Sequence, residues 1–502
     1  MNVPSLFERA RLQPDEPGLV DRSQTLSWRD VEDRVVRLSN ALLELGIPYG
    51  KRLAVLGENS NETVLIYAAA ALAGLGTILV NYHLTTDEVQ YLLDDGAAWA
   101  IWSSTESLPK ATAAASSLGL LVLADVENTG DWRTRAGAGS NRRQPGNLPT
   151  TTDLIYTSGT TGSPKAVEFP SQITPTVDDR LQSMARHHMA GLGPHLVVGP
   201  LYHAGPHGAV GLLLTGSPVV VPGRFDADFV LDAIASHHIA TSVMVPTHLI
   251  RLLGLPEQRR QEADASSLKM ISVTGSACPI TVKQAMIDWF GPVFVETYGA
   301  SESGIITRIT SDEWLAHPGS VGRALPRFHP LVLGRNGSPR PAGTGGVLYF
   351  VDDSGRGIRY HKDPEKTAAA HLVPGTFTLG DIGHVDEDGY LYITGRVTDM
   401  VISGGVNIYP AECEKILADH PAVTDVALFG IPDDEMGEQL VGLVSLKDAT
   451  TTPDELVTFC RGSLAGYKIP RHLVVVPEVP RSPMGKIDKR SARDAYLATT
   501  QI

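Results

Sequence analysis

The chain has 502 residues, too many for a single hydrophobic core, so its length predicts at least two domains. A composition of 42% hydrophobic and 20% charged residues is that of an ordinary globular protein. The formal net charge of −14 argues against a general nucleic-acid-binding protein, whose surface should be basic, but a local basic pocket could still hold an anionic ligand.

The cysteines and the apolar stretches indicate the cellular compartment of the protein. Cys278, Cys413 and Cys460 are far apart in the sequence and lack the spacing of metal ligands, which is typical of unpaired thiols in a reducing cytoplasm. The N-terminus lacks a basic flank followed by an apolar run, so no secretory signal is expected. The uncharged stretch 64–80 is about as long as a short membrane span, but two glycines divide it. We expect a buried helix and then a buried strand there, and no integral membrane segment.

The first part of the chain alternates strand and helix. A strand is expected over 52–57, a helix capped by polar residues 58–62 and ending near residue 73, and a strand over 77–81. This βαβ order predicts a parallel sheet with both faces covered. Further elements are expected at 84–94 (helix), 99–102 and 118–123 (strands), before a polar connection over 125–150.

A second series and a change of pattern follow. Strands are expected over 196–199, 218–221, 241–245, 269–274 and 293–296, with helices over 227–238, 247–253 and 281–290. Beyond about residue 320, short β segments with glycine-rich turns are expected over 346–351, 357–360 and 389–394. The last part predicts helices over 410–419 and 453–460 with strands over 426–430, 441–445 and 472–476, enough for a separate α+β domain.

One stretch combines hydroxyls, glycines and a lysine directly after the apolar pair Leu154-Ile155: Tyr156-Thr-Ser-Gly-Thr-Thr-Gly-Ser-Pro-Lys165. Glycine lets a backbone approach a ligand closely, and successive amide and hydroxyl groups can point at phosphate oxygens. The NTPase P-loop needs Gly-Lys-Ser/Thr in sequence, which this stretch lacks. By composition alone, a flexible loop is as good an interpretation as a phosphate-binding loop.

The order of these residues resembles the signature of the adenylate-forming superfamily, which includes acyl- and aryl-CoA ligases, adenylation domains and luciferases. Further stretches match the family's motifs in the family's order, so the resemblance covers essentially the whole chain. They are Gly275-Ser-Ala-Cys-Pro279, Glu296-Thr-Tyr-Gly-Ala-Ser-Glu302, Leu379-Gly-Asp-Ile-Gly383 with Tyr392-Ile-Thr-Gly-Arg396, the segment from Gly395 to Glu412, and Gly485-Lys486. Ser301 and Leu379 stand where the family more often has Thr. Ser301 keeps the hydroxyl, and only a minor contact is in doubt at Leu379.

The resemblance implies a fold as well as a site. It is α/β, with a large N-terminal domain (1–397) of two doubly wound sheets plus a β subdomain, and a small mobile α+β C-terminal domain (398–502). Asp399 would be the hinge between them, and Ser403, Gly404 and Gly405 would border the CoA tunnel. Without the other motifs, the glycine pair would be read as a plain turn.

The resemblance also implies a nucleotide site. Tyr298 would stack on the purine, Asp381 would accept the ribose hydroxyls with help from Arg396, and Glu302 and Thr160 would bind Mg²⁺, which usually takes one or two carboxylates plus substrate phosphates. The implied ATP and AMP contacts are Thr157, Ser158, Gly159, Thr160, Thr161, Gly162, Lys165, Gly275, Ser276, Ala277, Glu296, Thr297, Tyr298, Gly299, Ala300, Ser301, Asp381, Arg396 and Lys486.

The segment Pro200-Leu-Tyr-His-Ala-Gly-Pro-His207 lies where the family's acyl pocket begins. It has no Asp to hold an α-ammonium, which argues against an amino acid, and Pro-x-x-His resembles CoA ligases for aromatic and fatty acids. His203 would gate the pocket, while His207 fits better as pocket lining or a core histidine. The pocket would be lined by Tyr202, His203, His207, Gly275, Gly299 and Gly304, and the catalytic residues would be Lys486, His203 and Glu302.

The function implied is activation of an apolar or aromatic carboxylic acid to acyl-AMP, with ATP and Mg²⁺, followed by transfer to the thiol of coenzyme A. Lys486, otherwise part of a solvated basic tail, would reach the reacting carboxylate and α-phosphate. An amine or a carrier-protein thiol as acceptor, and a nucleotide- or acyl-binding sensor without catalysis, stay open. So do the identity of the acid and whether the chain is a monomer or a homodimer.

Overall fold

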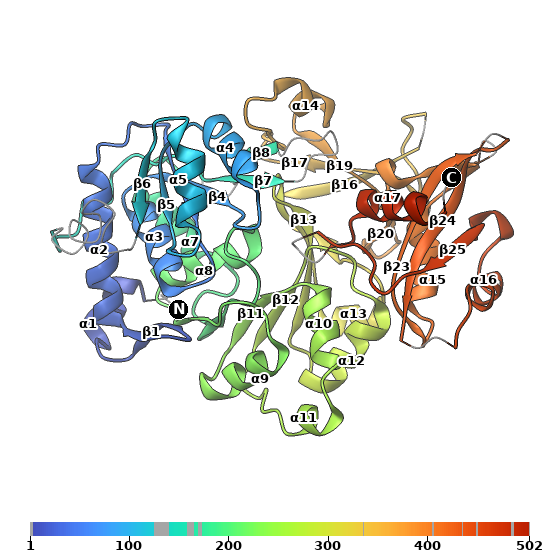
Figure 1. The fold of residues 1–502 in the computed structure, drawn as a ribbon, viewed down its shortest axis with the longest axis horizontal. Coiled ribbons are helices and arrows are strands. Elements are labelled where there is room, and N and C mark those ends of the chain that lie inside the picture. The colour runs from blue at the N-terminus through green and yellow to red at the C-terminus, as the bar shows by residue number, and fades with distance from the viewer. Residues whose placement is uncertain are drawn as a thin grey trace.

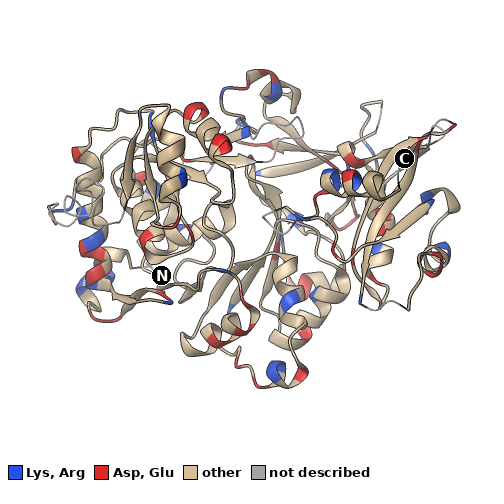
Figure 2. Cartoon of the chain, viewed as in Figure 1, with Lys and Arg blue, Asp and Glu red and all other residues tan. Residues whose placement is uncertain are grey.

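The computed structural model describes residues 4–124, 140–157, 165–168, 173–334, 336–403, 406–433, 435–447, 450–482 and 486–500, with the side chains of residues 157, 406 and 407 excepted. Figure 1 shows a large part, coloured blue to yellow, and a smaller part in orange and red. Lys and Arg are interspersed with Asp and Glu along the outer helices of both parts (Figure 2). The α/β fold predicted from the sequence is confirmed.

A six-stranded sheet carries the start of the candidate phosphate loop. Its order is β6-β5-β3-β4-β7-β8, parallel except for β8, which is antiparallel to β7. The strands are β3 (Arg52–Leu56), β4 (Gly76–Val80), β5 (Ala98–Ser103), β6 (Leu121–Ala124), β7 (Leu154–Thr157) and β8 (Lys165–Glu168). The helices between them are α3 (Asn61–Leu72), α4 (Thr86–Asp95) and α5 (Leu108–Ser116). The candidate loop therefore runs from the end of β7 to the start of β8.

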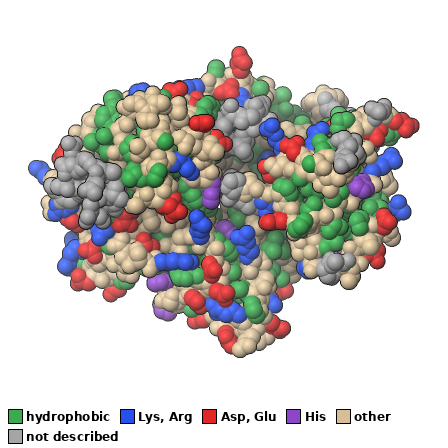
Figure 3. Space-filling model, in the orientation of Figure 1, with side chains coloured by type: hydrophobic (Ala, Val, Ile, Leu, Met, Phe, Trp, Pro, Cys, Tyr) green, Lys and Arg blue, Asp and Glu red, His purple; other side chains and the backbone are tan. Residues whose placement is uncertain are grey.

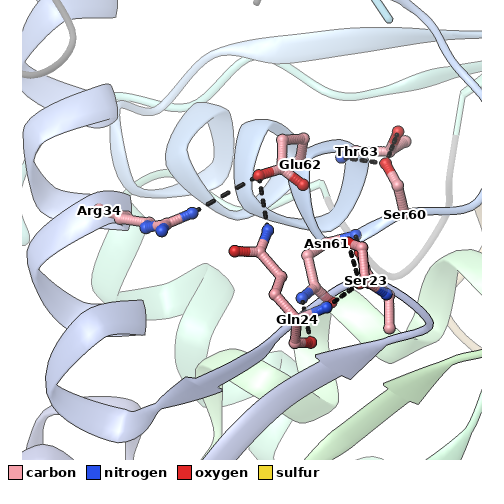
Figure 4. A network of polar contacts seen from close by, with 8 residues as sticks. Ser23, Gln24, Arg34, Ser60, Asn61, Glu62 and Thr63 are labelled. Carbon is pink, nitrogen blue, oxygen red and sulfur yellow. Dashed lines mark hydrogen bonds and ion pairs between the residues drawn. The ribbon is translucent and has the colours of Figure 1, made fainter.

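The predicted buried helix and strand within 64–80 are α3 and β4, and the core surrounds both. Ser60 caps α3 by accepting a hydrogen bond from the Thr63 amide. Figure 4 shows how the turn after β1 is fastened to this helix end. The side-chain Nε2 of Gln24 donates to Glu62 Oε1 at 3.0 Å, and Asn61 Nδ2 donates to the backbone carbonyl of Gln24 at 3.3 Å. Since β1 belongs to the second sheet, these bonds join the two sheets. Among the described residues, no helix is long and apolar enough to cross a membrane.

The second sheet has nine strands in the order β15-β14-β13-β12-β11-β9-β10-β1-β2. Its central strands are parallel, and β2, β14 and β15 are antiparallel to their neighbours. The strands are β1 (Pro17–Asp21), β2 (Thr25–Ser27), β9 (His195–Leu196), β10 (Val219–Val221), β11 (Thr241–Met244), β12 (Met270–Val273), β13 (Phe294–Ala300), β14 (Gly304–Thr310) and β15 (Arg323–Ala324). The helices are α1 (Leu6–Leu12), α2 (Trp28–Glu44), α7 (Val177–Ala185), α8 (Ala204–Leu214), α9 (Ala227–Ser236), α10 (Pro246–Leu253), α11 (Glu257–Gln261), α12 (Ile280–Phe290) and α13 (Ser311–Ala316).

An antiparallel β subdomain follows, as predicted, although only two of the five strands that the structure describes in it, β17 and β20, were expected. Its strands are β16 (Phe328–Leu333), β17 (Gly346–Asp352), β18 (His371–Val373), β19 (Thr376–Val385) and β20 (Leu391–Arg396), with the helix α14 (Pro364–Ala369). The strand expected over 357–360 is wrong. Gly357 has a positive φ of 62°, and Tyr360 instead forms an isolated bridge with Val167 of β8. The segment therefore crosses to the six-stranded sheet.

The chain ends in a smaller α+β unit. It contains β21 (Val401–Ser403), β22 (Val406–Ile408), β23 (Val423–Asp433), β24 (Gly437–Leu446), β25 (His472–Val475), α15 (Pro410–Ala418), α16 (Pro453–Arg461) and α17 (Lys489–Thr500). Two hydrophobic clusters lie wholly within it, so the unit has a core of its own. All three cysteines are free, although Cys413 and Cys460 are buried with their Sγ atoms 3.6 Å apart. The three-dimensional fold brings together two thiols that the sequence separates.

Candidate active site

The turn that carries His203 is held by an asparagine from the first sheet. Asn59 Nδ2 donates to the Gly199 carbonyl at 2.8 Å, and its Oδ1 accepts from the Leu201 amide at 2.9 Å. The His203 amide donates to the Pro200 carbonyl at 3.0 Å, and α8 begins directly afterwards. Both edges of the Asn59 amide thus fix the backbone on which His203 stands.

His203 lies in a buried aromatic environment beside Lys486. Its ring centre is 4.3 Å from that of Tyr202, which is itself buried and packs edge-on against Tyr82. Burial, and secondarily the Lys486 ammonium, lowers the pKa of His203 to about 3. The imidazole is therefore neutral at physiological pH and can act only through hydrogen bonds and shape.

Lys486 reaches into the site from the C-terminal part. The Gly275 backbone passes so close to it that a β-carbon at residue 275 would lie 3.6 Å from Lys486 Cε. Burial lowers the pKa of Lys486, and the nearby Arg396 guanidinium lowers it further, while the Glu302 and Asp381 carboxylates act in the opposite direction. One ammonium group therefore sits among residues of three different sequence motifs.

Asp381 is a buried carboxylate held by two donors. The Tyr298 hydroxyl donates to Asp381 Oδ2 at 2.6 Å, and Arg396 Nε donates to Asp381 Oδ1 at 2.9 Å. Burial raises the pKa of Tyr298 strongly, and the adjacent Asp381 raises it further, so the phenol stays protonated and donates. These bonds fix the Asp381 carboxylate and hold the Tyr298 hydroxyl against it.

Glu302 lies on the side of the site that faces β8. Burial raises the pKa of Tyr360, and the Glu302 carboxylate, to which the Tyr360 hydroxyl hydrogen-bonds, raises it further. Lys165 lies at the start of β8, and its Nζ is 3.4 Å from Asp363 Oδ2. Mg²⁺ is commonly held by one or two carboxylates plus substrate phosphates, so the chemistry of the Glu302 side chain fits a magnesium ligand.

Some predicted residues lie elsewhere. The Glu296 carboxylate is buried and accepts from Lys283 Nζ at 2.6 Å, so its side chain belongs to the core between β13 and α12. His207 is buried with its Nε2 3.6 Å from Asp153 Oδ2, which matches the core interpretation. Gly299 is required by packing, since a β-carbon there would lie 2.0 Å from the Gly304 carbonyl oxygen.

Other predicted residues lie at the edges of the site or beyond the described part. Thr274, next to Gly275, donates to the carbonyl of Thr297, which ties the Gly275–Ala277 turn to β13. Ala300 ends β13 and Ser301 begins the turn after it, Ser403 ends β21, and Asp399 lies in the 3₁₀ turn Val397–Asp399. The side chain of Thr157 and residues Ser158, Gly159, Thr160, Thr161, Gly162, Gly404 and Gly405 lie outside what the structure describes.

Sequence reasoning missed Asn59, Tyr360 and Lys366. The sequence indicates Asn59 only as one of several polar residues that cap α3. Tyr360 and Lys366 lie between the recognised motifs. Their contacts span large separations, such as the 140 positions between Asn59 and Gly199, so no local pattern reports them. Figure 3 shows blue Lys and Arg and purple His side chains near the boundary between the large and small parts on the face displayed.

Comparison with known proteins places these features in context. The family profile described as AMP-binding enzyme matches residues 6–354, and the one described as AMP-binding enzyme C-terminal domain matches 412–486. The indoleacetate–CoA ligase of Aromatoleum aromaticum is 32% identical over 98% of this chain and 97% of its own length.

Two solved structures are similar over nearly their whole length. The o-succinylbenzoate CoA synthetase of Bacillus subtilis, solved with its acyl-adenylate intermediate, is 25% identical with a TM-score of 0.80, covering 97% of this chain and 96% of that one. The amide bond synthetase of Marinactinospora thermotolerans has a TM-score of 0.84 at 24% identity, covering 98% of this chain and 100% of that one, which is a likeness of fold.

Proposed function

The chain belongs to the AMP-binding enzyme family, and we propose that it activates an apolar or aromatic carboxylic acid to acyl-AMP with ATP and then transfers the acyl group to coenzyme A. The observation that carries this proposal is the position of Lys486. An ammonium from the C-terminal part lies against Gly275 and within electrostatic reach of both Asp381 and Glu302. A cation at this place can stabilise charge that develops during adenylation.

In the first step, the substrate carboxylate attacks the α-phosphorus of ATP, and pyrophosphate leaves. Lys486 binds the reacting carboxylate and α-phosphate oxygens. Tyr298 stacks on the adenine, and Asp381 with Arg396 holds the ribose; the hydrogen bonds from Tyr298 and Arg396 keep that carboxylate in place. Residues 157–162 and Lys165 bind the outgoing phosphates, with backbone support from Gly275–Ala277 and Thr297–Ser301. Glu302 and Thr160 would hold Mg²⁺, which neutralises phosphate charge when bound.

In the second step, the thiol of coenzyme A attacks the acyl carbonyl and AMP leaves. The part over 398–502 rotates as a lid against the part over 1–397, with Asp399 as the hinge, and Ser403, Gly404 and Gly405 line the path of the thiol. Lys489 Nζ lies 3.6 Å from Asp399 Oδ2 and 2.8 Å from Glu414 Oε1, so the hinge residue is tied to the lid in the conformation observed. No protein nucleophile is needed.

The acid itself is apolar or aromatic. We expect the pocket to begin at Tyr202 and His203, directly before α8, whose first turns contain small residues, and to include Gly275, Gly299 and Gly304. A neutral His203 and the absence of an acidic residue from 200–207 fit an acid without an ammonium group. The indoleacetate–CoA ligase that this chain resembles acts, by its name, on an aromatic acid.

Pyrophosphate exchange across a panel of acids tests the proposal. Exchange that depends on an aromatic or aliphatic acid, followed by formation of a CoA thioester detected by mass spectrometry, is the expected result. Parallel reactions with amines and with carrier protein separate CoA ligation from amide formation and carrier loading, which would use the same acyl-AMP. Absence of exchange with every acid, despite nucleotide binding, would support a sensor without catalysis instead.

A further inference from the structure

Two lysines from distant parts of the chain lie together beside Glu302. Lys165 begins β8, and Lys366 lies in α14, which Figure 1 shows above the ends of β7 and β8. Lys366 Nζ sits 3.8 Å from the centre of the Tyr360 ring, and Lys165 Nζ lies 3.4 Å from Asp363 Oδ2. Among the described residues, the structure gives Lys366 no ion pair with a carboxylate.

The backbone holds the two lysines in this arrangement. Tyr360 bridges Val167, and the His361 amide donates to the Ala166 carbonyl at 2.9 Å, which fastens this segment to β8. The Thr367 hydroxyl accepts from the Tyr360 amide at 3.0 Å and so folds the segment back on itself. Lys366 is therefore not a freely moving surface side chain.

Bringing two ammonium groups together is unfavourable unless an anion joins them. Burial lowers the pKa of Lys366, and the Lys165 ammonium lowers it further, against the opposing effect of Glu302. Asp363 offsets part of this repulsion, but one of its oxygens already accepts from the Lys366 amide at 2.9 Å and the other faces Lys165. A polyanion bound between the lysines would relieve the remaining repulsion.

The order of charges across the site indicates which anion fits. The Lys486 ammonium interacts electrostatically with Asp381 and Glu302, whereas the Lys366 ammonium interacts with Glu302 and Lys165. Asp363 links the two lysines, since its Oδ1 accepts from the Lys366 amide and its Oδ2 accepts from Lys165 Nζ. Lys366 therefore lies on the side of the site where Lys165 would bind the outgoing phosphates. We propose that Lys366, paired with Lys165, binds the two phosphates of ATP that leave as pyrophosphate. This inference rests on the proposed function and adds a binding residue that none of the sequence motifs contains.

Binding measurements on the Lys366→Met variant test the inference, since Met keeps the unbranched stem over the Tyr360 ring without the charge. Calorimetry with MgATP, Mg-pyrophosphate and AMP separates the two ends of the nucleotide. We expect Kd to rise about tenfold for MgATP and for pyrophosphate, as for loss of one charged contact, and to change less than about twofold for AMP. Lys366→Arg should restore most of the lost affinity.

Lys362→Met is the matched control, because it removes the same charge from the same segment. Lys362 Nζ donates to the Asp95 carbonyl and does not contact Lys165. Unchanged pyrophosphate affinity in Lys366→Met, or an equal loss for AMP, would overturn the inference while leaving the proposed function standing. A wild-type protein that binds neither MgATP nor pyrophosphate would refute the proposed function itself. If Lys366→Met does not fold, Lys366→Gln is measured in the same way.

Discussion

Lys486, from the C-terminal part, interacts electrostatically with Asp381, Glu302 and Arg396 of the candidate site. Replacing it with Ala removes the cation from the reacting centre but leaves the adenine and ribose contacts in place. We expect the Lys486→Ala variant to lose about a hundredfold or more in acid-dependent pyrophosphate exchange, as for other charge-stabilising groups. Thioester formation from supplied acyl-AMP should stay within a few-fold of wild type.

These two half-reactions are measured separately, with radiolabelled pyrophosphate and with synthetic acyl-AMP plus CoA. Lys489→Ala is the control for pyrophosphate exchange alone, since this neighbouring lysine pairs with the hinge residue Asp399 and with Glu414 rather than with the nucleotide site. An equal loss of both half-reactions in Lys486→Ala would show that Lys486 is not confined to adenylation.

Tyr298 offers a second residue-level prediction, about nucleotide affinity. The Tyr298→Phe variant keeps the ring but removes the 2.6 Å hydrogen bond to Asp381, which leaves a buried carboxylate with one donor fewer. We expect Kd for AMP to rise about fivefold to tenfold, the usual cost of losing a hydrogen bond to a charged group.

Calorimetry with AMP measures this effect, and Tyr392→Phe is the matched control. The Tyr392 hydroxyl also donates to a carboxylate, Asp386 Oδ2, at 3.2 Å, but away from the nucleotide site. Equal affinities of Tyr298→Phe and wild type would mean that Asp381 does not depend on Tyr298 for its position.

At the scale of elements, the 3₁₀ turn Val397–Asp399 joins β20, which carries Arg396, to the C-terminal part. Proline fixes φ, so Asp399→Pro should restrict rotation there. We expect the thioester-forming step to slow at least tenfold while pyrophosphate exchange changes little, because only the second step requires the proposed rotation. Rapid-quench kinetics of acyl-AMP consumption gives the first rate and isotope exchange gives the second.

Asp399→Ala distinguishes the hinge from its ion pair. This variant removes the carboxylate that faces Lys489 but leaves the backbone free to rotate. It should therefore keep most of the thioester rate. A thioester rate for Asp399→Pro that equals the wild-type rate would argue against rotation at this residue.

Local patterns were sufficient to predict most elements, because strand and helix alternate with clear polar boundaries. A strand was expected over 293–296, and β13 covers it, whereas no strand was expected over 376–385, where β19 carries Asp381. The structure brings the Tyr298 hydroxyl to Asp381 and Lys486 into electrostatic contact with Asp381. The sequence patterns did not reveal which side chains of the motifs would be buried in the core. Glu296 looked like part of the nucleotide site, yet Lys283, from a helix without any motif, binds it in the interior.

Local sequence patterns also could not predict the contacts between distant segments. Residues 357–360 have the composition of a short strand, but their partner is β8, nearly two hundred positions earlier, and the pairing within the described part of the chain is a single isolated bridge. The same crossing brings Tyr360 to Glu302 and Lys366 to Lys165. Such placements depend on how the subdomains pack together, which no window of sequence contains.

At the scale of the whole molecule, the acidic net charge and the basic site have different consequences. A net charge of −14 repels ATP at long range, so recognition must come from the local group of Lys165, Lys366, Arg396 and Lys486. Local attraction within a partly buried site is screened by salt less than attraction at the surface is. The overall charge therefore does not conflict with binding a polyanion.

Buried and half-buried histidines distributed over the N-terminal part predict how stability depends on pH. Burial lowers the pKa of His195 and His203 to about 3 and that of His187 and His248 to about 4. In the unfolded chain, each titrates near 6.5. Between about pH 6.5 and pH 4, the unfolded state therefore binds more protons than the folded state, and stability falls as the pH falls.

The contribution of a single histidine can be isolated at His195, which is buried with its Nδ1 2.9 Å from Thr241 Oγ1. His195→Gln cannot titrate, so its free energy of unfolding should depend on pH less steeply, by up to about 1.4 kcal/mol per pH unit. Denaturant unfolding at pH 6.5, 5.5 and 4.5 measures the slope. Thr241→Val breaks the same hydrogen bond but keeps the imidazole, so it should lower stability without flattening the slope. Equal slopes for His195→Gln and wild type would mean that His195 takes up its proton in the folded state.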